Sequence, residues 1–350
     1  EVLQSKQRYE MKAWQINDAY EISQVKRGET PSLDSEVKVK TTKAMLSKDD
    51  VTLYNGDDKP AYPLIPCRFA VGVIVEAEET ANGYSKNERV YLDPISNCKQ
   101  CYSCTIGQPK DCSRLNIAGI NSEGFMKDFA VVPFESVYPL PESVSDTEAL
   151  FIEYISLAIS VIDKLKIQKG EHVAIIGGNV VGNIIAQLII YYQAVPIIID
   201  DNDTNLEIAK RSGVYYTLKA DGRLEKEVSE LTGARMTSKA VYVTSCGINT
   251  EVALKLSRAN ATVAFVGFNY SNIRVNFTQA MQKQLRFHCI TNGYGNAEAS
   301  INLIANKAIN LKNFNLLSAN FSDVPKVFKS ADAKLKDEQE VYNCVIDMMN

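Results

Sequence analysis

Residues 172–183 read HVAIIGGNVVGN, an apolar run that passes directly into a glycine-rich turn. The run is typical of a buried strand, and the stretch after the turn has the apolar texture of a buried helix. A strand, a turn of the form G-x-G-x-x-G and a helix together make up the dinucleotide-binding fingerprint. Here Gly177 would make the tight turn and Gly182 would let the helix pack close to the strand. The turn itself reads Gly177-Gly178-Asn179-Val180-Val181-Gly182.

The middle position of this turn departs from the fingerprint, because Asn179 stands where the pattern has glycine. Its side chain restricts how closely the backbone and a pyrophosphate can approach each other, although asparagine tolerates a positive φ better than most residues. The backbone N–H of Asn179 is still available to an anion at the helix N-terminus. The alternative is a nucleotide-free domain of the same fold, in which the glycines serve packing alone.

An acidic residue follows at the distance that the fingerprint requires. Asp200 ends the next apolar strand, 18 residues after Gly182, and Asp201 follows it. A carboxylate at this place accepts hydrogen bonds from the adenosine ribose diol and repels the 2′-phosphate of NADP(H). The sequence therefore predicts a preference for NAD(H).

The segments on either side of the motif indicate two domains of different architecture. Downstream, short apolar strands alternate with helices, which is the pattern of βαβ units and a parallel sheet. Upstream, runs of β-branched and aromatic residues are separated by turn residues, which predicts strands. The predicted fold class is therefore α/β, with a β-rich domain and a doubly wound parallel sheet. We expect helices at residues 150–165, 183–194, 204–212 and 251–258, and upstream strands at residues 11–16, 37–41, 71–77, 89–92 and 129–132.

Composition excludes several classes of protein. The 350 residues, 45% hydrophobic and 23% charged, are typical of a soluble globular chain of about two domains. A net charge of −4 without a basic patch argues against a nucleic-acid partner. No stretch is apolar enough for a membrane span. Residues 1–10 lack the apolar core of a secretory signal, so we expect a cytoplasmic protein, and Met11 is a candidate for the natural start.

Four of the eight cysteines lie within fifteen residues, in the pattern Cys98-x2-Cys101-x2-Cys104-x7-Cys112. Such clustering in an intracellular chain indicates a metal rather than disulfides. Four thiolates around a tetrahedral zinc form a closed structural site with no open position for a substrate. We predict one structural zinc per chain. An iron–sulfur cluster and four unligated thiols are the alternatives.

These motifs, with further stretches along the chain, resemble the zinc-type medium-chain dehydrogenases/reductases, in particular the polyol, threonine and alcohol dehydrogenase branch. The resemblance runs from Met11 to the C-terminus. Besides the glycine turn and the cysteine cluster, it rests on MKAWQI at 11–16, ERVYLDP at 88–94, EGFMKDFAVVP at 123–133, FIEYISLAISVI at 151–162 and VTSCG at 243–247.

The resemblance implies a GroES-like catalytic domain at residues 1–152 and 289–350, with a structural-zinc lobe at residues 93–115. It implies a Rossmann NAD-binding domain at residues 153–288 and a small-molecule substrate in a cleft between the two domains. By analogy with the family we expect a homodimer or homotetramer, formed through the Rossmann edge near Tyr294. Besides the glycine turn, the predicted cofactor-binding residues are Asp200, Asp201, Ser245, Cys246 and Gly267.

The sequence departs from this family at the catalytic metal. Members that use a catalytic zinc carry a Cys-Gly-Thr/Ser-Asp segment and a Gly-His-Glu segment, which correspond here to Ser47-Lys48-Asp49-Asp50 and Cys67-Arg68-Phe69. A catalytic zinc needs about three protein ligands, and serine, arginine and phenylalanine replace the usual ones. We therefore expect no catalytic zinc. A rearranged site that uses Cys67, Glu153 and Asp50 is the alternative.

Three functional hypotheses follow. The first is an NAD(H)-dependent oxidoreductase that acts on a small polar or anionic substrate without a catalytic zinc. In it, Arg68 anchors the substrate electrostatically or forms an ion pair with Glu153. The second is an inactive NAD(H)-binding pseudoenzyme. The third is a conventional zinc dehydrogenase with rearranged ligands and two zinc ions per chain. The predicted catalytic-site residues are Ser47, Asp50, Arg68 and Glu153.

Overall fold

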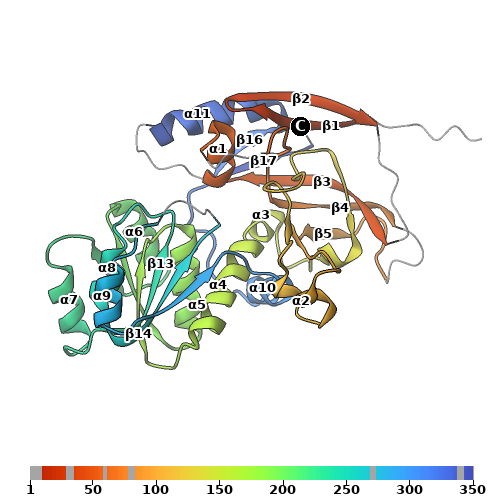
Figure 1. Ribbon diagram of the computed structural model, residues 1–350. Helices are drawn as coiled ribbons and strands as arrows, with labels where there is room; N and C mark the ends of the chain where they lie inside the picture. The colour runs from red at the N-terminus through yellow and green to blue at the C-terminus, as the bar shows by residue number, and fades with distance from the viewer. Residues whose placement is uncertain are drawn as a thin grey trace, which may run out of the picture. The chain divides into compact units, whose positions relative to one another are not determined.

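The computed structural model describes residues 10–28, 35–57, 61–77, 83–268, 273–336 and 343–349 (Figure 1). The chain divides into two compact units. Unit 1 consists of Glu1–Leu150 and Asn315–Asn350, and unit 2 consists of Phe151–Phe314. Within the described residues, no helix is long and apolar enough to cross a membrane.

Unit 2 is built on a sheet of six parallel strands, in the order β12-β11-β10-β13-β14-β15. The chain starts in the centre with β10, moves outward to β12, and then returns to lay β13 on the other side of β10. The strand order therefore reverses between β10 and β13, which is where doubly wound sheets bind their ligands. The strands are β10 (His172–Ile176), β11 (Val195–Asp200), β12 (Tyr216–Lys219), β13 (Thr237–Val243), β14 (Ser257–Val266) and β15 (Arg286–Ile290).

Helices cover both faces of this sheet, and its central strands are accordingly apolar on both sides. Figure 1 shows α7 and α8 on one side of the strands and α4 and α5 on the other. Side chains of β10, β11, β13 and β14 form one core cluster with those of α7 and α8. The helices of unit 2 are α4 (Ile152–Leu165), α5 (Val180–Tyr191), α6 (Asp203–Arg211), α7 (Leu224–Leu231), α8 (Glu251–Leu256), α9 (Phe277–Gln282) and α10 (Ala297–Ala305).

The predicted helices of this unit are confirmed, and several of their ends are shifted by one to three residues. Helix α5 begins at Val180 rather than at residue 183, because the Asn179 side chain caps its first turn. Helix α8 ends at Leu256 rather than at residue 258, and β14 starts at the next residue. The ammonium group of Lys283 binds the carbonyl oxygens of Leu254, Lys255 and Ser257 and so satisfies the end of this helix.

Residues 289–314 fall in unit 2, whereas the resemblance grouped them with the catalytic domain. Two elements explain the difference. Strand β15 is the sixth strand of the parallel sheet, paired with β14, and α10 packs against α4. Gly293 fits directly over the backbone of α4, because a Cβ there would lie 2.1 Å from the carbonyl carbon of Ser156.

Unit 1 is β-rich, and the five strands predicted for it are confirmed. Its main sheet has the order β16-β17-β3-β4-β5-β9, with β8 also paired to β3, and β1 and β2 form a separate antiparallel hairpin. The strands are β1 (Glu10–Asp18), β2 (Glu21–Gly28), β3 (Glu36–Leu46), β4 (Phe69–Ala77), β5 (Arg89–Leu92), β6 (Ile95–Ser96), β7 (Asn116–Ile117), β8 (Phe129–Pro133), β9 (Val137–Pro139), β16 (Leu317–Asn320) and β17 (Cys344–Asp347).

Two helices of unit 1, α1 and α11, pack against each other. Between them, the ring centroids of Tyr54 and Phe328 lie 5.0 Å apart. A capping box of Ser145 and Glu148 starts α3. The helices are α1 (Lys48–Asn55), α2 (Tyr102–Thr105), α3 (Asp146–Ala149) and α11 (Val324–Lys336).

Candidate functional site

The glycine turn after β10 has the geometry that the fingerprint predicts. Gly177 has φ of +103°, a conformation that favours glycine. At Gly182 a Cβ would lie 1.8 Å from the carbonyl oxygen of Gly177, so any larger residue would push α5 away from the turn. At Gly178 a Cβ would lie 2.9 Å from Ile198 of the neighbouring strand. The close approach of helix, turn and strand thus depends on all three glycines.

Asp200 lies at the end of β11 with its carboxylate turned toward the glycine turn. It accepts hydrogen bonds from the backbone N–H of Gly178 (2.5 Å) and of Asn202 (2.8 Å) and from the side chain of Asn205 (3.3 Å). Burial raises the pKa of Asp200, and the hydrogen bonds from Asn202 and Gly178 oppose that rise. A carboxylate offers about four acceptor positions, so Asp200 retains capacity for a ribose hydroxyl. Asp201 is exposed beside it.

Asn179 is the N-cap residue of α5 and has extended backbone, with φ of −63° and ψ of −174°. Tolerance of positive φ therefore plays no part at this position. Its side-chain oxygen accepts hydrogen bonds from the N–H groups of Val181 (3.1 Å) and Gly182 (3.3 Å). Its side-chain amide donates to the hydroxyl of Ser245, 3.0 Å away.

The loops after β13 and β14 bring the remaining predicted cofactor residues to the same edge of the sheet. Ser245 reaches Asn179, as described, and Cys246 packs beside Gly177, where a Cβ would lie 2.6 Å from the Cys246 Cβ. Burial raises the pKa of the Cys246 thiol to about 11, so it is protonated at neutral pH. Gly267 lies against Thr244, whose hydroxyl oxygen would be 2.0 Å from a Cβ at that position.

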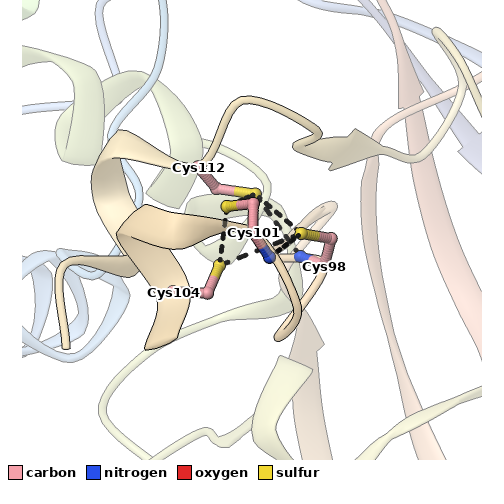
Figure 2. Close-up of side chains that lie close together, drawn as sticks. All are labelled: Cys98, Cys101, Cys104 and Cys112. Carbon is pink, nitrogen blue, oxygen red and sulfur yellow. Dashed lines mark hydrogen bonds between the residues drawn. The ribbon is translucent and has the colours of Figure 1, made fainter. Parts of the chain in front are cut away.

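The four predicted zinc ligands meet in unit 1, as Figure 2 shows. Their ligand atoms all lie within 4.8 Å of one another. The Sγ–Sγ distances are 3.5 Å for Cys101–Cys104 and for Cys98–Cys112, 3.8 Å for Cys101–Cys112 and 4.0 Å for Cys98–Cys104. A tetrahedral centre with Zn–S bonds of about 2.3 Å spaces its sulfur atoms about 3.8 Å apart. The residues therefore fit a structural zinc.

Backbone N–H groups around the cluster favour the thiolate form of Cys98 and Cys101, whereas burial raises the pKa of Cys104 to about 12. The N–H of Cys101 lies 3.3 Å from the sulfur of Cys98, and that of Arg114 lies 3.4 Å from the sulfur of Cys112. Hydrogen bonds from the backbone of Cys104 and Ser113 lower the pKa of Cys101 to about 5. Donors aimed at sulfur are what a negatively charged thiolate ligand requires.

The residues at the predicted catalytic metal position make a different arrangement. Asp50 is buried in the first turn of α1, and its carboxylate accepts hydrogen bonds from the backbone N–H (2.8 Å) and hydroxyl (3.0 Å) of Ser47 and from the backbone N–H of Cys67 (2.8 Å). Burial raises the pKa of Asp50, and these hydrogen bonds and the charge of Arg68 oppose the rise. The carboxylate thus joins the start of α1 to the segment before β4.

Arg68 and Cys67 are both buried at this junction. The guanidinium of Arg68 lies 5.9 Å from the ring centroid of Phe69. Cys67 has φ of +77°, and its thiol lies 3.4 Å from the carbonyl oxygen of Met45 and 3.3 Å from that of Phe69. Glu153, the fourth predicted catalytic residue, is buried in the first turn of α4 in unit 2.

Gly124 helps to hold the backbone conformation at Cys67 and is not among the predicted site residues. It packs on the Cys67 backbone so closely that a Cβ at Gly124 would lie 2.3 Å from the carbonyl oxygens of Cys67 and Pro66. The N–H groups of Gly124 and Phe125 donate to Ile65 and Cys67. The glycine in the stretch EGFMKDFAVVP was the available signal, because a glycine can mark a place where another backbone segment approaches closely.

Two family models match the chain. Residues 33–142 match the alcohol dehydrogenase GroES-like domain, and residues 180–311 match the zinc-binding dehydrogenase domain. An uncharacterized zinc-type alcohol dehydrogenase-like protein of Haemophilus influenzae is 23% identical over 88% of this chain and 90% of the relative. A sorbitol dehydrogenase of Halalkalibacterium halodurans is 27% identical over 71% of this chain and 74% of the relative.

Among solved structures, the fold is similar to that of a protein of Escherichia coli CFT073 described as a short chain alcohol dehydrogenase (RspB) complexed with the cofactor NADH. The TM-score is 0.84 and the identity 23%, over 97% of this chain and 99% of that one. The similarity thus extends over both units and includes a GroES-like and a Rossmann-like part.

Proposed function

Because this chain belongs to the zinc-type medium-chain dehydrogenase/reductase family, we propose that it is an NAD(H)-dependent oxidoreductase that acts without a catalytic zinc. Its substrate is a small polar molecule of the polyol or sugar class, as in the related sorbitol dehydrogenase. One observation carries the zinc-free part of the proposal. The Asp50 carboxylate is committed to Ser47 and Cys67, so this acid of the metal position serves to hold two backbone segments together.

The donor set also argues against a second metal. The Ser47 hydroxyl donates to Asp50, and the Cys67 thiol lies against two carbonyl oxygens. Arg68 brings a permanent positive charge to a place where a cation would need anionic or neutral ligands. These residues do not fit a zinc ion, whereas the four cysteines of the lobe do.

The preference for NAD(H) over NADP(H) is supported by Asp200. Its buried carboxylate lies at the glycine turn and is joined to it by the Gly178 N–H. A 2′-phosphate would place about two negative charges beside this carboxylate and beside Asp201. Neither residue can neutralise these charges, so both repel the phosphate. The three glycines let β11, the turn and the start of α5 pack closely, and the N-terminus of this helix is where the fingerprint binds the pyrophosphate of a dinucleotide.

When bound, the nicotinamide supplies or accepts the hydride. The protein must then orient the substrate and stabilise the charge that develops on its oxygen. We assign this task to Arg68, because its guanidinium is always charged and presents a fork of donors to a carboxylate or an oxyanion. Burial strengthens such an interaction, since water screens it less.

Binding and turnover measurements test this proposal. We expect NADH to bind more tightly than NADPH. We also expect NAD⁺-linked oxidation of polyols or NADH-linked reduction of keto-sugars in a panel of such compounds, and an active-site zinc chelator should not abolish this activity. Arg68→Met should keep NADH binding and lose turnover, and Arg68→Lys should retain part of it. A wild-type protein that binds NADH and converts no member of the panel would favour a pseudoenzyme. A homodimer or homotetramer also remains a prediction, which light scattering checks.

A further inference from the structure

Asn179 occupies the part of the glycine turn that a pyrophosphate would use. The first N–H groups of a helix lack partners within the helix and bind anions for that reason. In this chain two of them, those of Val181 and Gly182, already donate to the Asn179 side-chain oxygen. A glycine, as the fingerprint has at this position, would leave both groups free.

The other end of the same side chain is also held. Its amide donates to Ser245, in the loop after β13, whereas Asn179 itself follows β10. The strand order reverses between these two strands, and the ligand crevice of such a sheet opens there. The Asn179–Ser245 hydrogen bond therefore joins the two loops that flank this point of the sheet.

From these contacts we infer that Asn179 competes with the cofactor pyrophosphate for the N-terminus of α5 and lowers the affinity of the protein for the dinucleotide. The inference rests on the proposed use of NAD(H). Cofactor binding requires the Asn179 side chain to give up its hydrogen bonds to Val181, Gly182 and Ser245. The cofactor must therefore displace this side chain. Asn179 is thus a residue that sets cofactor affinity and release.

Two substitutions separate this role from a structural one. Asn179→Gly removes the side chain, and glycine is itself accepted at the N-cap of a helix, so the fold should persist. We expect NADH to bind about 3- to 30-fold more tightly, the range that corresponds to the usual strength of an N-cap hydrogen bond. Asn179→Asp keeps the size and the cap but adds a negative charge, and should weaken NADH binding at least tenfold.

Calorimetric titration with NADH, ADP-ribose and adenosine shows which part of the cofactor the Asn179 side chain affects. ADP-ribose contains the pyrophosphate, and its affinity should rise in Asn179→Gly as that of NADH does. Adenosine contains no phosphate, and its affinity should stay unchanged. Ser245→Ala removes only the hydrogen bond to the Asn179 side-chain amide and should tighten NADH binding about twofold. Asn276→Gly removes a matched N-cap, that of α9, and should leave all three affinities unchanged.

The outcomes distinguish this inference from the proposed function. If NADH binds wild type but binds Asn179→Gly equally or more weakly, the inference fails and the proposed cofactor stands. If neither protein binds NADH or ADP-ribose while both remain folded, both fail. If Asn179→Gly binds NADH and wild type does not, the inference is supported, because the side chain keeps the cofactor out, and the proposed NAD(H)-dependent activity of the wild-type chain fails.

Discussion

At the scale of single residues, Asp200 and Asn179 both form hydrogen bonds at the glycine turn. The sequence identifies both positions but predicts the role of Asp200 better than that of Asn179. Asp200 was predicted from its spacing alone and lies at the glycine turn, because the fingerprint fixes both its strand and its place at the strand end. Asn179 was predicted to adapt through its backbone, and acts through its side chain instead. A hydrogen bond to a residue 66 positions away, such as Ser245, leaves no periodic signal in a sequence.

The same limit applies to Asp50 and Arg68. The resemblance places both at the position of the catalytic metal. The hydrogen bonds between Ser47 and Asp50 belong to the local capping box of α1, whereas the bond from the Cys67 N–H to Asp50 depends on how α1 and the segment before β4 meet in space. The replacement of the zinc ligands stays a prediction from the resemblance, and the bond from Cys67 could not be predicted from the sequence.

Asp200→Asn tests the cofactor preference. Asparagine keeps the size of the side chain and removes the negative charge that accepts from the ribose and repels a 2′-phosphate. We expect the affinity for NADH to fall roughly tenfold, the effect of losing one charged hydrogen bond, and the preference for NADH over NADPH to narrow. Fluorescence titration with both nucleotides measures this. Asp201→Asn is the matched control at the exposed neighbour, and an equal effect of both variants would contradict the assignment.

At the scale of elements, the short helix α8 shows how tertiary contacts decide a boundary. The sequence predicted that it would continue to residue 258, because nothing local stops it. Lys283, 27 residues after Leu256, provides the end by binding three backbone carbonyl groups near it. A lysine at a helix C-terminus also interacts favourably with the helix dipole.

Lys283→Met should therefore lower the free energy of unfolding by about 1–3 kcal/mol, because it leaves three carbonyl oxygens, two of them partly buried, without their charged donor. Urea denaturation measures the loss. Lys255→Met is the control, since the Lys255 ammonium is nearly half exposed and makes only a long contact of 3.8 Å with Glu225. A loss at Lys283 no greater than that at Lys255 would show that the carbonyl groups are satisfied without the lysine.

Glu123 joins β2 to the segment before β8 and gives this link a pH dependence. Partial burial raises its pKa, but the hydrogen bond from Arg27 and the charge of Lys127 outweigh burial and leave the pKa below 4.5. A carboxylate with a lowered pKa stabilises the fold above its ordinary pKa and loses that contribution as pH falls through the lowered value.

The difference in unfolding free energy between wild type and Glu123→Gln should therefore be at most about 1 kcal/mol at pH 7, because the ion pair is half exposed. It should shrink as pH falls from about 4.5 toward 3. Denaturant unfolding over this range measures the difference. A gap that stays constant or widens on acidification would refute the assignment of the stabilisation to the carboxylate.

At the scale of the whole molecule, the division into a β-rich and a doubly wound unit was predictable and one boundary was not. The strands in the centre of the parallel sheet are continuous apolar runs, which the sequence shows plainly. Strand β15 lies at the sheet edge and reads RFHCI, with an exposed arginine and only its last residue buried. Such an edge strand gives a weak apolar signal. For this reason the sequence could not assign residues 289–314 to the unit that contains the parallel sheet.

We expect the cysteine lobe to depend on a bound zinc more than the rest of the chain does. No residue of α2 is buried, so packing contributes little to holding this turn. A structural zinc supplies the missing stabilisation where such a core is absent. Removal of zinc with a strong chelator should expose residues 97–113 to hydrogen exchange while the strands of the six-stranded sheet stay protected. Simultaneous exchange of both regions would show that the lobe supports the whole fold.

The most direct test of a zinc-free active site is the zinc content of the purified chain, measured by elemental analysis for wild type and for Cys104→Ser. We predict one zinc per chain in the wild type and none in the variant, because the four cysteines are the site whose geometry fits the ion. Two zinc ions in the wild type and one in the variant would contradict the central claim. The protein would then be a zinc dehydrogenase whose ligands differ from those of its relatives.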